Sequence, residues 1–131
     1  MRNLKVTAAV LKKEGKYLIA KRKQNDILGG LWEFPRGKIE EGETAEECLK
    51  REIKEELNII VEVNELILSK NHKYSKGYFE LIAFKVKYIS GEIILNEHDD
   101  YKWVPYEKLA MFNFLLADIP IIDKIKNNDR L

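Results

Sequence analysis

The chain has 131 residues, 45% of them hydrophobic and 34% charged, and its formal net charge is +1. This length and composition fit one folded domain over residues 1–131 and exclude an intrinsically disordered chain. The small net charge excludes a general attraction to a nucleic-acid polymer or to a membrane surface, so any charged partner must bind at a local site.

The first third of the chain predicts a β-hairpin. Residues Leu4–Lys12 are rich in Val, Ala and Leu and are typical of a strand, and Lys13–Lys16 is a turn into a returning strand at Tyr17–Arg22. A loop at Asn25–Gly30 and a short strand at Leu31–Phe34, stopped by a proline, follow. Polar residues interrupt the apolar N-terminal run, so no signal peptide or membrane span is expected and the cytoplasm is the expected location.

A helix is predicted over Thr44–Leu57. Thr44 and Glu47 have the spacing of a capping box, which satisfies free amides of the first turn. Asn58 follows the helix, and asparagine tolerates the left-handed conformation at which helices often end. Cys48 lies at an apolar helix position and is expected to be a small core residue; as a single cysteine it cannot form an internal disulfide.

The second half of the chain predicts strands closed by short helices. The expected strands are Ile59–Val63, Glu65–Lys70, Tyr78–Ile89 and Tyr101–Val104, and the expected helices are Tyr106–Ala110 and Ile119–Lys126. A long helix embedded among strands indicates a layered domain of the α/β (α+β) class.

One face of the predicted helix changes from apolar to acidic along its length. At about 100° per residue, Cys48 and Leu49 share a face that Glu52 and Glu56 continue, with Glu55 beside them. Three carboxylates this close repel one another and also lie at the unfavourable negative end of the helix dipole. A hard divalent cation, Mg²⁺ or Mn²⁺, would make the cluster favourable. The alternative is a solvated face whose acids pair with nearby Lys and Arg side chains.

The residues around this acidic face resemble the signature of the Nudix hydrolase family, G-x5-E-x7-R-E-U-x-E-E-x-G-U, in which U is a bulky apolar residue. The matching positions are Gly37, Glu43, Arg51-Glu52-Ile53, Glu55-Glu56 and Ile59. Asn58 stands where the family has glycine. The resemblance covers nearly the whole chain and implies an α/β/α sandwich with a mixed β-sheet and a loop-helix-loop motif.

The resemblance implies hydrolysis of a nucleoside diphosphate linked to another group, with Mg²⁺ or Mn²⁺ as cofactor. The implied metal ligands are Glu52, Glu55, Glu56, Glu97 and the Gly37 carbonyl, and the implied catalytic residues are Glu52, Glu55, Glu97 and Arg51. Arg51 resembles the family arginine that holds a motif glutamate, with Glu43 in a supporting role. A metal ion neutralises the pyrophosphate and lowers the pKa of a bound water, whose proton a carboxylate takes.

Glu97 resembles the further ligand or base that the MutT-like branch of the family carries before a strand containing Trp. It is therefore an alternative to Glu52 as the proton acceptor, although a surface loop position is the other interpretation. Asp99 and Asp100 are possible substitutes. His98 is expected to be solvated, and His72 structural or exposed.

The run GGLWEFPRGKIEEGE resembles the MutT-like nucleoside triphosphate pyrophosphohydrolases. The positions implied to bind substrate are Arg22, Glu33, Phe34, Lys38, Tyr74, Lys76 and Asp118. Arg22 would reach the triphosphate unless it is only a basic strand end, whereas Glu33 and Phe34 would line the base pocket. Asp118 would accept hydrogen bonds from guanine N1–H and N2–H or a cytosine amine, or would cap a helix. Trp32 should point to the opposite strand face and be core.

One residue departs from that branch, which usually reads F-P-G-G-K where this chain has Phe34-Pro35-Arg36-Gly37-Lys38. A basic residue at this position also occurs in Nudix enzymes that hydrolyse dinucleoside polyphosphates. Two interpretations of Arg36 stay open, a phosphate contact or a side chain facing solvent.

The expected function is hydrolysis of nucleoside triphosphates to monophosphate and pyrophosphate, with oxidised nucleotides such as 8-oxo-dGTP as substrates. The alternatives are a dinucleoside polyphosphate or CTP-type hydrolase and a non-catalytic nucleotide sensor, although sensors commonly lose the acids that this chain keeps. The expected partners are a small nucleotide and no nucleic-acid polymer or membrane, with the chain as a monomer or homodimer.

Overall fold

Within residues 4–129, which the computed structural model describes, seven strands form one mixed sheet. The strands are β1 (Leu4–Lys13), β2 (Lys16–Arg22), β3 (Trp32–Glu33), β4 (Arg36–Lys38), β5 (Ile60–Tyr74), β6 (Gly77–Ser90) and β7 (His98–Pro105). The sheet order is β3-β2-β1-β6-β5, while β4 pairs with β1 and β7 pairs with β2. The pair β1–β6 is parallel and the others are antiparallel.

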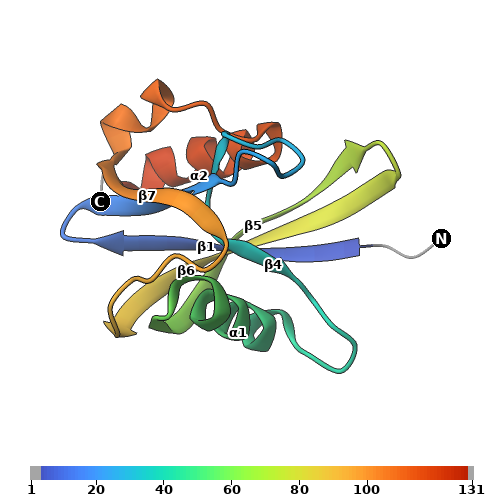
Figure 1. Ribbon diagram of the computed structural model, residues 1–131, viewed down its shortest axis with the longest axis horizontal. Helices are drawn as coiled ribbons and strands as arrows, with labels where there is room; N and C mark the ends of the chain where they lie inside the picture. The colour runs from blue at the N-terminus through green and yellow to red at the C-terminus, as the bar shows by residue number, and fades with distance from the viewer. Residues whose placement is uncertain (1–3, 130–131) are drawn as a thin grey trace.

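Helices cover both sides of this sheet. Helix α1 (Ala45–Leu57) lies on one side, and α2 (Ile119–Asp129) lies on the other with two 3-10 helices, η1 (Tyr106–Met111) and η2 (Leu116–Asp118) (Figure 1). This arrangement confirms the expected α/β/α sandwich. No helix in the described part of the chain is long and apolar enough to cross a membrane.

The central strand β1 contributes to a hydrophobic core on each side of the sheet. Val6, Ala8 and Val10 belong to the core on the α2 side, whereas Ala9 and Leu11 belong to the core on the α1 side. Successive side chains of a strand point to opposite faces, so a strand covered on both faces is apolar throughout. This explains why the sequence of β1 reads as an almost continuous apolar run.

Both ends of α1 have the predicted caps. Thr44 Oγ1 accepts a hydrogen bond from the Glu47 amide at 3.1 Å, and the Glu47 carboxylate accepts one from the Thr44 amide at 2.8 Å. Asn58 adopts the left-handed conformation, with φ 63° and ψ 23°. Its side-chain amide donates to the Glu92 carbonyl at 3.3 Å, a contact that the glycine of the family signature cannot make.

Two predicted elements differ from the observed ones. The strands expected at Ile59–Val63 and Glu65–Lys70 are parts of the single strand β5, because pairing with β6 continues through register shifts between Val63 and Leu68. Such bulges absorb extra residues without ending a strand. The helix expected at Tyr106–Ala110 is the tighter 3-10 helix η1.

Strand β4 is absent from the predicted elements, because Pro35 indicates a stop. The chain resumes as a strand directly after this proline, and Gly37 lies opposite Thr7 of β1. The pairing is a long-range contact that local sequence does not encode. It places the residues just before the helix motif at the centre of the sheet.

Candidate active site

The acidic face of α1 turns inward, as its helical spacing predicts. Leu49, Ile53 and Leu57 are buried and anchor the helix on the sheet. Glu56 is buried on the same side, with 4% of its surface exposed. Glu52 is partly buried and Glu55 is exposed at the rim. The three carboxylates therefore range from fully covered to solvated.

Close packing at Gly37 fixes the position of Glu52. A Cβ atom added to Gly37 would lie 2.0 Å from Glu52 Cγ and 2.7 Å from Glu52 Cβ, which no side chain can tolerate. The Gly37 carbonyl accepts a hydrogen bond from Thr7 Oγ1 at 3.3 Å. The motif glycine is thus required for contact between β4 and α1, a role that the spacing of the motif does not reveal.

Arg51 contacts three acids at once. Its Nε and Nη2 form a fork on Glu43, at 2.7 and 2.8 Å, and its Nη1 binds Glu52 at 2.9 Å and Glu55 at 3.1 Å. The bond from Arg51 lowers the pKa of Glu43 to about 2. Among the described side chains, those of residues 4–126, no group of three or more acidic, His or Cys residues is arranged to hold a metal ion. Arg51 holds Glu52 and Glu55, while Glu56 is buried.

One carboxylate oxygen of Glu56 lacks the partner that a buried polar atom needs. Its Oε1 has no hydrogen-bond partner among the described residues. Burial, reinforced by the charges of Glu33, Glu97 and Glu52, raises the pKa of Glu56 to about 10. A buried acid in this state holds a proton at neutral pH or requires a cation. The chemistry of these oxygen donors suits Mg²⁺ or Mn²⁺.

A polar cavity of about 190 Å³ opens next to Glu56. Its lining residues are Arg22, Asp26, Glu33, Arg36, Glu56, Glu97 and His98. Glu97 is brought there by its neighbour Asn96, whose amide and side chain donate to the carbonyls of Glu56 and Glu55 at 3.0 and 2.8 Å. The structure thus places Glu97, which is exposed, at the same cavity as Glu56.

Glu33 is the centre of a buried ion network on this cavity. Its carboxylate binds Arg22 Nη1 at 2.8 Å and His98 Nε2 at 3.0 Å, and Arg36 Nε lies 3.5 Å away. Burial works to raise the pKa of Glu33, but the His98 hydrogen bond and the Arg36 and Arg22 charges outweigh it and hold the pKa below its usual value. The expectation that His98 is solvated is wrong, because pairing with β2 places it opposite Arg22 in the sheet.

Asp118 and Arg36 form a second buried ion pair. Asp118 is completely buried; its Oδ2 accepts from the Phe34 amide at 2.8 Å, and its Oδ1 binds Arg36 Nη2. The carboxylate therefore binds Phe34 and Arg36 rather than the amides of α2. Arg36 does not face solvent, because only 12% of its side chain is exposed. The other interpretation, a phosphate contact, stays a prediction, since Arg36 lines the polar cavity.

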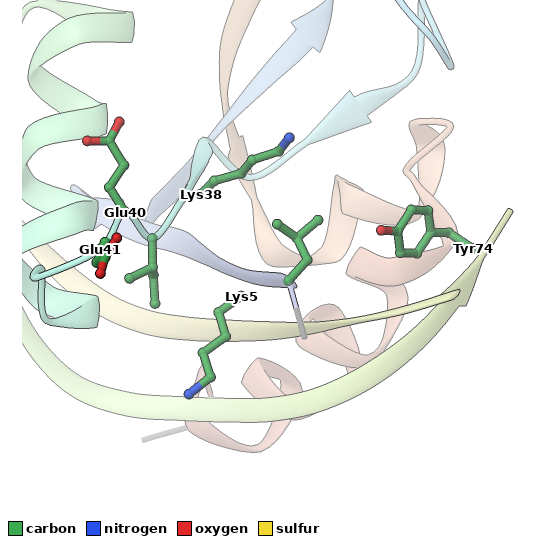
Figure 2. Close-up of a pocket in the computed structure, with 7 residues that line it drawn as sticks. Lys5, Lys38, Glu40, Glu41 and Tyr74 are labelled. Atoms are coloured by element: carbon green, nitrogen blue, oxygen red, sulfur yellow. The ribbon is translucent and has the colours of Figure 1, made fainter. Parts of the chain in front are cut away.

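A larger cavity of about 490 Å³ lies at the other end of β4. Its lining residues are Leu4, Lys5, Lys38, Ile39, Glu40, Glu41 and Tyr74. Figure 2 shows Lys38 and Tyr74 extending toward one another from β4 and from the end of β5. Lys76 lies in the exposed turn after β5 and does not line this cavity.

The two aromatic residues of the predicted base-pocket strand are both core residues. Trp32 is buried, as expected. Phe34 is also completely buried, and its ring lies 5.6 Å from that of Phe114. A covered side chain cannot line an open pocket, so in this conformation Phe34 contributes its backbone to the site, through the amide that binds Asp118.

Comparison with known proteins gives consistent matches along the chain. The family model of the NUDIX domain matches residues 6–124. A CTP pyrophosphohydrolase of Escherichia coli (strain K12) is 33% identical over 123 residues, 94% of this chain and 91% of that protein. An 8-oxo-dGTP diphosphatase of Buchnera aphidicola subsp. Schizaphis graminum (strain Sg) is 31% identical, covering 92% and 91%. The solution structure of the E. coli ORF135 protein superimposes with a TM-score of 0.88 at 32% identity, covering 97% and 91%.

Replacing Gly37 by alanine is expected to destabilise the protein by about 1–3 kcal/mol, because the new Cβ displaces Glu52. Glu52→Ala removes the Cγ that the new Cβ meets, so the double variant should recover part of the loss. Urea denaturation of the wild type, both single variants and the double variant measures this coupling. If the changes in the free energy of unfolding of the two single variants add up to that of the double variant, the two residues are not in steric contact.

Glu56 is expected to make the metal-free protein less stable as pH rises. Its folded-state pKa of about 10 lies above the ordinary value of 4.5, so between these values the folded protein holds a proton that the unfolded chain releases. The free energy of unfolding should fall across this range, by at most about 1.4 kcal/mol per pH unit. Urea denaturation in a chelator at several pH values measures the slope.

Glu56→Gln is the matched test of this slope, since glutamine imitates the protonated acid. The variant should lose most of the slope and be more stable than the wild type above neutral pH. Glu62→Gln, at an exposed position of β5, should keep the wild-type slope. If Glu56→Gln also keeps it, another group causes the pH dependence.

Proposed function

The chain belongs to the Nudix hydrolase family, and on that premise we propose that it hydrolyses nucleoside triphosphates to monophosphate and pyrophosphate. Oxidised nucleotides such as 8-oxo-dGTP are the proposed substrates. The observation that carries the proposal is the buried Glu56 oxygen without a partner, which lies at a cavity shared with Glu97 and Arg22. A site of this kind combines carboxylates that can bind a cation with an arginine that can bind phosphate.

The proposed cofactor is Mg²⁺ or Mn²⁺. Glu52, Glu56 and Glu97 would hold it, with Glu55 and the Gly37 carbonyl as further ligands. Bound there, the ion would neutralise a polyphosphate and lower the pKa of a bound water. Glu52 Oε1 and the Glu55 carboxylate also bind Arg51, so an ion held by these two acids would share them with that arginine.

The protein residues supply positioning and proton transfer. Arg51, held by its fork on Glu43, orients Glu52. Glu52 or Glu97 would accept the proton of the attacking water as the oxygen bonds to phosphorus and the pyrophosphate group leaves. Arg22 would bind a phosphate oxygen in place of part of its contact with Glu33.

The larger cavity is the proposed place for the nucleoside. Lys38 at this cavity supplies a cation for the phosphates, and Tyr74 supplies an aromatic face for the base or sugar. Because Lys38 and Gly37 are neighbours on β4, a nucleotide bound there can extend its phosphates toward the acidic end of α1. Lys76 is retained as a proposed outer contact for the nucleotide.

A CTP-type activity is the second candidate, and the CTP pyrophosphohydrolase relative supports it. Hydrolysis of dinucleoside polyphosphates rests on a basic residue at position 36. Arg36 is already paired with Asp118 and Glu33, which weakens the support for this alternative. The intact acids Glu52, Glu55 and Glu56 argue against a non-catalytic sensor.

Glu52→Gln and Glu56→Gln are each expected to lower hydrolysis of 8-oxo-dGTP by about 10²–10⁴-fold, because each removes a charge that the reaction needs. Anion-exchange chromatography of the products should show monophosphate and pyrophosphate for the wild type, and circular dichroism should show an unchanged fold for the variants. Glu62→Gln is the control. Wild-type turnover by Glu56→Gln would refute the assignment of the site.

A further inference from the structure

Arg36 is held in place by three groups. It is the first residue of β4, opposite Ala8 of β1. Its Nη2 binds Asp118, its Nε donates to the Phe34 carbonyl at 3.3 Å, and the same Nε lies 3.5 Å from Glu33. A planar guanidinium gripped along one edge has a defined orientation, unlike a flexible surface arginine.

This placement removes Asp118 from contact with a ligand. Asp118 has no exposed surface, and its two oxygens bind the Phe34 amide and Arg36. A carboxylate can only accept hydrogen bonds, so an uncovered Asp118 would select groups that donate them. With Arg36 in place, a ligand that approaches this position meets N–H groups instead of carboxylate oxygens.

Arg36 retains hydrogen-bonding capacity for such a ligand. Its hydrogen bonds and ion pairs with the side chains and backbone of residues 4–126 use Nε and Nη2, which leaves the two N–H bonds of Nη1. Arg36 also lines the polar cavity beside Glu33 and Arg22. The residue therefore presents a donor, with its charge balanced by Asp118.

A group of aromatic rings at the β5–β6 hairpin reaches the larger cavity through Tyr74. His72 stacks on Phe79 with ring centroids 5.5 Å apart, and Tyr74 meets Phe79 edge-on at 5.6 Å. Burial, with the charges of Lys70 and then Arg36, lowers the pKa of His72.

Strand geometry adds a second link between Arg36 and the larger cavity. Arg36 and Lys38 are two residues apart on β4 and so share one side of the strand. Lys38 lines the cavity together with Tyr74. A flat base lying between β4 and the β5–β6 hairpin would thus have rings along its face and Arg36 at its edge.

We propose that Arg36 determines the nucleobase preference of this enzyme, by covering Asp118 and presenting a hydrogen-bond donor to the base edge. The site then favours bases with a keto oxygen over bases with an amino group at the same position. This inference rests on the proposed function. It distinguishes cytosine nucleotides from guanine-type nucleotides, and relatives named for each class resemble this chain.

The chemistry of the bases makes the distinction sharp. Guanine, 8-oxoguanine, hypoxanthine and uracil carry a keto oxygen, which accepts from Arg36. Adenine and cytosine carry an amino group there, which would point its own N–H groups at those of Arg36. A buried donor left without an acceptor is costly, so the site discriminates against the amino bases.

The test uses matched pairs that differ in this group and in the protonation of the adjacent ring nitrogen. The values of kcat/KM are measured for UTP against CTP and for ITP against ATP, and the values of Kd for the monophosphates UMP and CMP by calorimetry. The wild type should prefer the keto member of each pair by about tenfold or more. Arg36→Gly should reduce the preference to near unity or reverse it, because Asp118 becomes accessible to an amino group.

Three further variants keep the test decisive. Arg36→Lys retains the charge without the fork and should lose most of the preference, whereas Lys87→Ala, at an exposed position of β6, should retain it. If Arg36→Gly fails to fold, Arg36→Gly combined with Asp118→Asn removes both charges and should bind UMP and CMP equally.

The inference is overturned if the wild type binds UMP and CMP equally, prefers CMP or binds neither. It is also overturned if Arg36→Gly, or the double variant in its place, keeps the wild-type ratio. A wild type that binds UMP over CMP but hydrolyses no triphosphate would refute the proposed function and support the role of Arg36.

Discussion

The contact between Gly37 and Glu52 is the constraint on which the site depends. It lets strand β4 lie directly against α1, with no space for a side chain at position 37. The contact fixes where the acidic end of α1 sits relative to the sheet, and the buried leucines and isoleucine of the helix fix its rotation. Glu56 then lies in the interior with its Oε1 unpartnered among the described residues, and the energetic cost of that position is what a bound cation would remove.

Pairing with arginine side chains stabilises the other buried acids of the site, Glu33 and Asp118. Arg22 and Arg36 face Glu33 and Asp118, and each buried acid also accepts a hydrogen bond from His98 or from the Phe34 amide. Isolated buried charges are strongly unfavourable, whereas paired and hydrogen-bonded ones persist. Glu56 is the buried acid that keeps an oxygen without a hydrogen-bond partner among the described residues, and this is where we propose that a cation binds.

The parts of this structure that the sequence predicts well are local. The capping box of Thr44, the left-handed Asn58 and the inward face of α1 all follow from spacing within one helix. The signature match also identifies Gly37, although its packing against Glu52 becomes visible only when β4 and α1 are brought together.

The parts that sequence reasoning misses depend on contacts between distant residues. Arg36 and Asp118 are 82 positions apart, and His98 meets Glu33 across 65. No local pattern distinguishes a buried arginine from a solvated one, so the ion pair and the buried histidine could not be foreseen. Strand β4 is short and follows a proline, and it exists because β1 offers it a free edge.

The most direct test of the central claim is anomalous diffraction from crystals soaked in Mn²⁺ together with a nucleotide. The account predicts an anomalous peak within coordination distance of Glu56 and Glu52, and its loss in crystals of Glu56→Gln. A peak elsewhere, or none beside these two carboxylates in the wild type, would contradict it.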